Sequence, residues 1–219
     1  MTWRMKNTQV KICGLSTVET LNTACQAGAD YVGFVFYERS PRHISYEQAR
    51  ALSRAVPDGV SKVALTVNTD DATLRQIVAT LNPDILQLQG NESPTRVAEI
   101  KQKFGLPVLK AIPIQLKKDI AAAEPYAGIA DMILFDAKAP ADMADALPGG
   151  NGISFDWKQL DDEFIKGDFM LAGGITAQNV GEAIAVTKAA IVDISSGVES
   201  SPGKKDCALI AEFIAAVKG

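Results

Sequence analysis

Short apolar runs recur along the whole chain, and most are followed by a segment with helical periodicity. Each run is four to six residues long and is bounded by small or turn-forming residues, as buried strands are. Eight runs meet this description: residues 9–13, 31–36, 62–67, 85–88, 108–111, 132–135, 169–172 and 191–194. The repeat of about 25 residues is the size expected of one strand and one helix.

Amphipathic segments fill the spaces between these runs. The pattern predicts helices at residues 17–27, 46–55, 70–81, 95–104, 117–126 and 205–217, with shorter helices at 155–160 and after Asn179. Apolar strands that alternate with helices indicate a parallel sheet covered on both faces. We expect a (β/α)₈ TIM barrel in which residues 1–219 form one α/β domain, with residues 1–8 as a short N-terminal extension. A doubly wound open sheet is the alternative, but the first βα turn has no Gly-x-Gly-x-x-Gly motif.

Composition narrows the class of protein. The net charge of −4 gives no support to nucleic-acid binding, and no apolar run is long enough to span a membrane. The first residues lack the apolar region of a secretory signal, so we expect a cytoplasmic protein. Three widely spaced cysteines favour reduced thiols over disulfides, and the single histidine weakens any metal site built from imidazoles. We expect no metal.

The last two apolar runs end abruptly in small residues. Gly173 and Gly174 follow the seventh run, and Ser195, Ser196 and Gly197 follow the eighth. Small residues past a strand let a ligand approach the backbone, and in TIM barrels phosphate commonly binds at the loops after strands seven and eight. This pair of loops predicts a phosphate site. The alternative is that they are only tight turns with glycine in left-handed conformations.

Two residues at predicted strand ends, Cys13 and Asp136, can exchange protons near neutral pH. A modestly stabilised thiolate is a base at that pH, and a desolvated aspartate keeps its proton and is an acid. The pair is therefore a candidate base and acid on opposite sides of a substrate. The alternatives are that Cys13 is a small buried apolar residue and that Asp136 is a cap or turn residue.

Other polar residues near strand ends have less specific roles. The planar guanidinium of Arg42 suits a substrate carboxylate, although a surface salt bridge is the default for an isolated arginine. Lys110 is either a Schiff-base lysine or half of an ion pair in the barrel mouth. Residues 136–152 are long and irregular, which is typical of a lid or a binding loop.

Taken together, the motifs resemble those of phosphoribosylanthranilate isomerases, which act in tryptophan biosynthesis. Any one motif is weak, but their order and spacing along nearly the whole chain are specific. They occupy residues 11–15 (KICGL), 34–36 with 40–42 (FVF, SPR), 87–90 (QLQG), 134–136 (LFD), 171–174 with 179–180 (LAGG, NV), 192–199 and 202–206.

The resemblance implies an Amadori rearrangement that needs no cofactor. It implies that Asp136 is the general acid, that Cys13 is the general base, and that Arg42 binds the anthranilate carboxylate. Asp193 would position the amino side of the substrate. The phosphate would bind to the backbone of the two small-residue loops, and the protein would be a monomer or a homodimer.

The fourth motif departs from the family at Gln89, where a histidine is common. Glutamine can donate a hydrogen bond but cannot relay a proton at neutral pH. Gln89 can replace a histidine that only orients the substrate; otherwise the activity or its pH profile should change. The rival hypotheses are another phosphosugar enzyme, such as a pentose-phosphate epimerase or indoleglycerol-phosphate synthase, and a catalytically silent phosphate-binding barrel.

Overall fold

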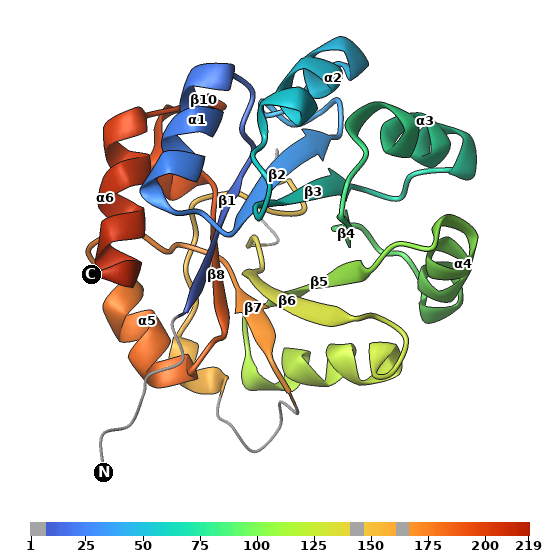
Figure 1. Cartoon of the computed structure of the whole chain (residues 1–219). Coiled ribbons are helices and arrows are strands. Elements are labelled where there is room, and N and C mark those ends of the chain that lie inside the picture. The colour runs from blue at the N-terminus through green and yellow to red at the C-terminus, as the bar shows by residue number, and fades with distance from the viewer. Residues whose placement is uncertain (1–7, 141–146, 161–166) are drawn as a thin grey trace.

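Eight parallel strands form a closed barrel in the computed structural model, which describes residues 8–140, 147–160 and 167–219. The strands follow one another around the barrel in chain order (Figure 1). They are β1 (Gln9–Cys13), β2 (Tyr31–Phe36), β3 (Ser61–Thr66), β4 (Ile85–Leu88), β5 (Val108–Ile114), β6 (Met132–Ala137), β7 (Phe169–Leu171) and β8 (Ile191–Ile194). Pairing of β8 with β1, from Gln9 opposite Ile191 to Ile12 opposite Ile194, closes the ring. The predicted (β/α)₈ barrel is confirmed.

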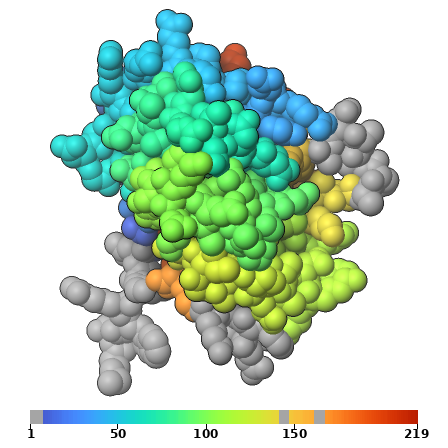
Figure 2. Space-filling view, turned by 90° about the vertical axis from the view of Figure 1, so that its right-hand side faces the viewer, coloured from blue at the N-terminus to red at the C-terminus, as the bar shows by residue number. Residues whose placement is uncertain are grey.

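Helices cover the outside of this barrel. The α-helices of the described residues are α1 (Val18–Ala27), α2 (Tyr46–Ala55), α3 (Asp71–Leu81), α4 (Pro94–Phe104), α5 (Val180–Thr187) and α6 (Cys207–Lys218). Several begin at a side-chain cap, such as Ser45, which forms a capping box with Gln48 before α2. Figure 2 shows α3 and α4, in green, lying over the side of the barrel.

The alternation of side chains along each strand separates two apolar clusters. The side chains on one face of each strand, such as Val10 and Ile12 of β1, point outward and pack in the main core between the strands and the helices. The opposite positions of β5 to β8 form a second, smaller cluster that includes Leu134 and Ile191. Two residues further along the same strands, on the same face, lie Asp136 and Asp193. Strand periodicity thus places both carboxylates on the face that lines the inside of the barrel.

The second half of the barrel departs from the predicted elements. The segment η1 (Lys117–Tyr126) is a 3₁₀ helix that buries only Ile120. Pro125 near its end has no N–H to donate and disfavours an α-helical last turn. The helix predicted at residues 155–160 is reduced to one 3₁₀ turn, η2 (Trp157–Gln159). Strand β6 continues through Asp136, which therefore lies within the strand rather than after it.

A two-stranded hairpin after β8 was absent from the prediction. The 3₁₀ turn η3 (Ser196–Val198) leads into β9 (Glu199–Ser201), which pairs antiparallel with β10 (Lys204–Lys205).

Within the described residues, no helix is both long and apolar enough to cross a membrane. Residues 1–7 of the expected N-terminal extension and residues 141–146 of the expected lid lie outside the described residues.

Candidate active site

A pocket opens where the barrel strands end, and it brings together side chains from every part of the chain. The ten residues that the sequence singled out all line it: Cys13, Arg42, Gln89, Asp136, Gly173, Gly174, Asp193, Ser195, Ser196 and Gly197. Residues 147–153 of the long loop after β6 also line it. The pocket is therefore formed by strand ends and by the loops that follow them, as in a TIM-barrel active site.

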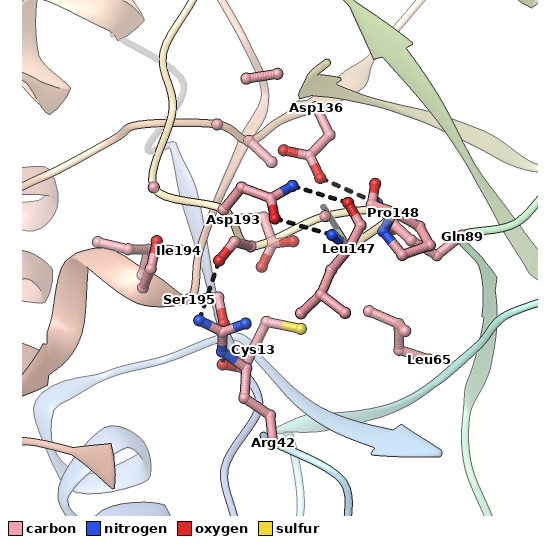
Figure 3. Close-up of a pocket in the computed structure, with 18 of the residues that line it drawn as sticks. Cys13, Arg42, Leu65, Gln89, Asp136, Leu147, Pro148, Asp193, Ile194 and Ser195 are labelled. Atoms are coloured by element: carbon pink, nitrogen blue, oxygen red, sulfur yellow. Dashed lines mark hydrogen bonds between the residues drawn. The ribbon is translucent and has the colours of Figure 1, made fainter. Parts of the chain in front are cut away.

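Cys13 and Asp136 lie on opposite sides of this pocket. Figure 3 shows the Cys13 sulfur directed into the space between the two side chains, with Asp136 at the far wall. Burial raises the pKa of Asp136 to about 7, and the Asp193 carboxylate acts in the same direction. Burial also raises the pKa of the Cys13 thiol, while the Lys11 ammonium group lowers it. The Cys13 thiol therefore keeps its proton at neutral pH, while Asp136 gains or loses its proton near pH 7.

A buried ion pair lies next to the thiol. The Lys11 Nζ is 2.9 Å from Asp193 Oδ2, and the lysine is fully buried. Burial alone would lower the Lys11 pKa, but Asp193 and Cys13 together outweigh the effect of burial, and the pKa is raised. The other Asp193 oxygen, Oδ1, is buried and has no hydrogen-bond partner among the described residues. A donor on a bound molecule would satisfy this oxygen.

Gly33 of β2 provides the space that these side chains occupy. A Cβ atom at position 33 would lie 3.0 Å from the Cys13 sulfur and 3.3 Å from Lys11 Cε. Any side chain there would displace one of the two groups, so the glycine lets the thiol and the ammonium group share one narrow space.

Arg42 is buried in the pocket wall and is not part of a surface salt bridge. Its Nε and Nη2 donate to the two carboxylate oxygens of Glu199, at 2.7 and 2.8 Å. Lys205 Nζ donates to the same carboxylate at 2.7 Å and to the Ser195 carbonyl oxygen at 2.9 Å. The Arg42–Glu199–Lys205 cluster thus holds two cations and one anion, a surplus of positive charge that favours an anionic ligand.

The two small-residue loops lie side by side along the pocket. Gly173 and Gly174 have φ angles of 91° and 63°, a left-handed conformation that favours glycine. The Asn179 side chain fixes this turn, because it donates to the Gly174 carbonyl at 2.9 Å and accepts from the Thr176 N–H at 2.7 Å. The glycines are therefore turn residues and pocket residues at once, and the turn places their backbone beside the pocket.

Gln89 contacts Asp136 directly. Its Nε2 donates to Asp136 Oδ2 at 3.0 Å and to the Pro148 carbonyl at 3.3 Å. Its Oε1 accepts a hydrogen bond of 2.7 Å from Gln87 Nε2. The side chain at this position therefore links the wall of the pocket to the loop after β6.

The sequence of the whole chain is similar to those of known proteins. A sequence model of N-(5'-phosphoribosyl)anthranilate (PRA) isomerase matches residues 10–216. The chain is 54% identical over 210 residues to N-(5'-phosphoribosyl)anthranilate isomerase of Parvibaculum lavamentivorans, with 96% of this chain and 98% of that protein covered.

This chain belongs to the N-(5'-phosphoribosyl)anthranilate isomerase family.

Solved structures of the family share the fold over nearly the whole chain. The crystal structure of the isomerase from Thermotoga maritima superposes with a TM-score of 0.86 at 34% identity, covering 97% of this chain and 99% of that one. A second isomerase structure, in complex with reduced 1-(o-carboxyphenylamino)-1-deoxyribulose 5-phosphate, has a TM-score of 0.83 at 33% identity, with the same coverage.

Sequence reasoning did not assign roles to four buried residues of this isomerase-family site: Lys11, Gln87, Glu199 and Lys205. For Lys11 and Gln87 the sequence did contain an indication of a role. Each is a charged or amide side chain inside an apolar strand, and such a side chain needs a polar partner when it is buried. Glu199 and Lys205 belong to a matching motif, but their partner Arg42 is more than 150 residues away in sequence. Lys110 pairs with Glu92 at 3.0 Å, so its ion-pair interpretation holds.

Proposed function

We propose that this chain catalyses the Amadori rearrangement of N-(5-phosphoribosyl)anthranilate to 1-(2-carboxyphenylamino)-1-deoxyribulose 5-phosphate in tryptophan biosynthesis. The observation that carries the proposal is the placement of Cys13 and Asp136 across one pocket. A thiol and a carboxyl group with raised pKa values face each other there, as a two-proton rearrangement requires. Membership of the isomerase family supports the same reaction.

The surroundings of the pair fit the three polar parts of this substrate. The backbone of the two small-residue loops is suited to the phosphate, and Arg42 is suited to the anthranilate carboxylate. The unpartnered Asp193 Oδ1 is suited to the anilino N–H. Each group is aimed by contacts within the protein, so the substrate is bound at three points with the ribose between base and acid.

The proposed chemistry moves two protons and needs no external electron acceptor. Asp136 protonates the ribose ring oxygen, the C1–O bond breaks, and the nitrogen lone pair forms an iminium ion. Cys13 then removes the proton from C2, and the C2–H electrons give an enolamine. Tautomerisation to the ketone reduces C1 and oxidises C2, so the product is an isomer of the substrate. The substrate nitrogen serves as the electron sink.

The reactive protonation state is a minor one in the free protein. The reaction needs a Cys13 thiolate and a protonated Asp136, yet the thiol has the higher pKa of the two. Around neutral pH the pair holds one proton, mostly on sulfur. Its transfer to Asp136 gives the reactive form, and the Lys11 ammonium group beside Cys13 stabilises the resulting thiolate.

This pairing predicts the pH dependence of the reaction. We expect kcat/KM to be level between about pH 7 and the thiol pKa and to fall about tenfold per pH unit on acidification below about pH 7, because both groups are then protonated. The measurement is kcat/KM against pH, with each rate corrected for the reaction without enzyme. A rate that stays constant well below pH 6 would contradict the assignment.

Replacing Arg42 should weaken substrate binding more than catalysis. We expect Arg42→Ala to raise KM by about tenfold or more with a small change in kcat, because the carboxylate contact is made in substrate and transition state alike. Glu199 keeps its hydrogen bonds from Lys205 and Gly203, so the fold should persist. Arg96→Ala is the control, because Arg96 is not among the pocket residues and contacts Asp71, Glu99 and the Thr69 carbonyl oxygen. An unchanged KM in Arg42→Ala would remove this residue from the carboxylate site.

The test of the whole proposal is a direct assay of the reduced protein. Freshly generated phosphoribosylanthranilate is added, the loss of its anthranilate fluorescence is followed, and the product is identified. Rapid conversion that EDTA does not inhibit would establish a metal-free isomerase that functions with Gln89. No conversion by a folded protein would refute it and favour a silent phosphate-binding barrel or another phosphosugar enzyme.

Location and assembly belong to the same proposal. A role in amino-acid biosynthesis supports a cytoplasmic location. A solved relative is described as mutually generated monomers of the dimeric isomerase from Thermotoga maritima. We propose a monomer or a homodimer here, which light scattering of the purified protein would decide.

A further inference from the structure

Two buried glutamines form a chain of hydrogen bonds that ends on the acid. Gln87 donates to Gln89 at 2.7 Å, and Gln89 donates to Asp136 Oδ2 at 3.0 Å. The two glutamines are two residues apart at β4 and its end, so they project to the same face and line the pocket. The chain of donors therefore runs in one direction, from Gln87 towards the carboxyl group.

The direction of this chain is fixed from one end by a backbone group. The Pro148 carbonyl can only accept a hydrogen bond, and it accepts from Gln89 Nε2 at 3.3 Å. The Gln89 NH₂ group therefore faces Pro148 and Asp136, and its carbonyl faces Gln87. Only a donor can satisfy that carbonyl, and Gln87 Nε2 supplies it. A reversed Gln89 amide would place its oxygen against the Pro148 oxygen and one amide group against the other.

The arrangement distinguishes the two oxygens of Asp136. Oδ2 accepts the Gln89 N–H, and Gly149 lies against it so closely that a Cβ atom there would collide with it. An oxygen that accepts a hydrogen bond from a fixed donor does not also carry the proton toward that donor. The proton of a neutral Asp136 therefore resides on Oδ1.

Gln87 is poorly suited to a purely structural role. Its Oε1 is buried and has no hydrogen-bond partner among the described residues, and leaving such a group unpaired destabilises the folded protein. An apolar side chain of the same length, such as methionine, would fill this position without that cost. The unsatisfied oxygen indicates that the position is occupied by glutamine for its NH₂ group.

We propose that Gln87 is a positioning residue: it holds the Gln89 amide with its NH₂ group towards Asp136, so that the acid presents its proton on Oδ1, the oxygen that does not accept the Gln89 hydrogen bond. The proposal rests on the proposed function of Asp136 as the acid. It assigns to Gln89 the orientation of the acid, and it makes Gln87 the side chain that, together with the Pro148 carbonyl, keeps the Gln89 amide in this direction. The charged groups that act on Asp136 from other strands are Asp193 of β8 and Lys11 of β1.

Two substitutions separate this role from simple packing. Gln87→Met keeps the length and removes the donor, so Gln89 loses one of the contacts that hold it. Gln87→Glu keeps the shape but provides only acceptors when ionised, so the Gln89 NH₂ group turns towards it and the Gln89 carbonyl faces Asp136. The acid proton then moves to Oδ2 and is held by that carbonyl instead of reaching the substrate. Gln9→Met and Gln9→Glu are the controls, because Gln9 is on β1 at the opposite end of the barrel and bonds to Tyr31.

The first readout is kinetic. We expect kcat to fall about tenfold in Gln87→Met and about 100-fold in Gln87→Glu, within the range that a general acid contributes, with KM changed less than about twofold. The second readout needs no substrate: the titration of Asp136 in the free protein, followed by the ¹³Cγ NMR signal and assigned with Asp136→Asn. Loss of the Gln89 N–H donor removes a group that stabilises the carboxylate, so the Asp136 pKa should rise in both variants and most in Gln87→Glu.

The outcomes decide between the two roles. A higher Asp136 pKa and a lower kcat in both Gln87 variants, with neither change in the Gln9 variants, would support the proposal. An unchanged Asp136 pKa in folded Gln87→Met and Gln87→Glu would overturn it, whatever their kcat. The NMR titration reports on the free protein, so its result stands even if the isomerase assay fails.

Discussion

Cys13→Ala is expected to lose kcat by about 10²–10⁴-fold, the usual contribution of a general acid or base, while the protein remains folded. No other thiol lines the pocket among the described residues, so the C2 proton has no equivalent acceptor. The Lys11–Asp193 ion pair does not depend on the sulfur, and the pocket wall on that side should persist. The measurement is kcat together with a thermal unfolding curve.

Cys25→Ala is the matched control for this result. Cys25 lies on α1, is partly buried against the core, and is not among the pocket residues. It should therefore keep wild-type kcat. Turnover near the wild-type value in Cys13→Ala would show that the base has been assigned wrongly.

Asp136→Asn should lose kcat by a similar factor and, at the same time, stabilise the fold at alkaline pH. The asparagine oxygen can accept the Gln89 hydrogen bond, but its NH₂ group cannot protonate the ribose oxygen. The folded-state pKa of about 7 lies above the ordinary value, so Asp136 favours folding only while it is protonated. The stability it contributes is complete below pH 4 and is lost as the pH rises to about 7.

The sign of the stability change distinguishes Asp136 from an ordinary structural aspartate. The gain in Tm for Asp136→Asn should be larger at pH 8 than at pH 5. Asp131, which precedes β6, is the control: its hydrogen bond from Lys101 lowers its pKa despite partial burial, so Asp131→Asn should lower the Tm at pH 8 and leave kcat unchanged. A lower Tm for Asp136→Asn at pH 8 would contradict the conclusion that burial destabilises the ionised form of Asp136.

Much of the barrel could be predicted because each strand is buried on both faces. In a run such as residues 31–36, the side chains on both faces of the strand are shielded from water, so nearly all of them are apolar. This continuous apolar composition identifies the strand in the sequence. The candidate catalytic and binding residues could be located by the same reasoning, because the carboxyl ends of all the parallel strands lie on one side of the barrel. The 3₁₀ segments escaped prediction because periodicity alone does not separate them from α-helices, and Pro125 is the only local sign.

The partners of the site residues could not be read from the sequence. Arg42 and Glu199 are 157 residues apart, and only the closed ring brings them within 2.7 Å. The direction of the Gln87–Gln89–Asp136 chain depends on the carbonyl of Pro148, a backbone group with no compositional signal. Sequence can name residues that are able to do chemistry, but hydrogen bonds across the barrel decide which atom of each is available.

Because β8 closes on β1, a ribosome must synthesise both strands before the barrel can form. Cys13 is synthesised early relative to Asp193, which pairs with its neighbour Lys11 and follows 182 residues after that lysine. Asp136, both small-residue loops and Glu199 all follow Cys13 by more than 120 residues. A chain whose translation stops before β8 therefore carries the thiol without the groups that enclose it in the complete pocket.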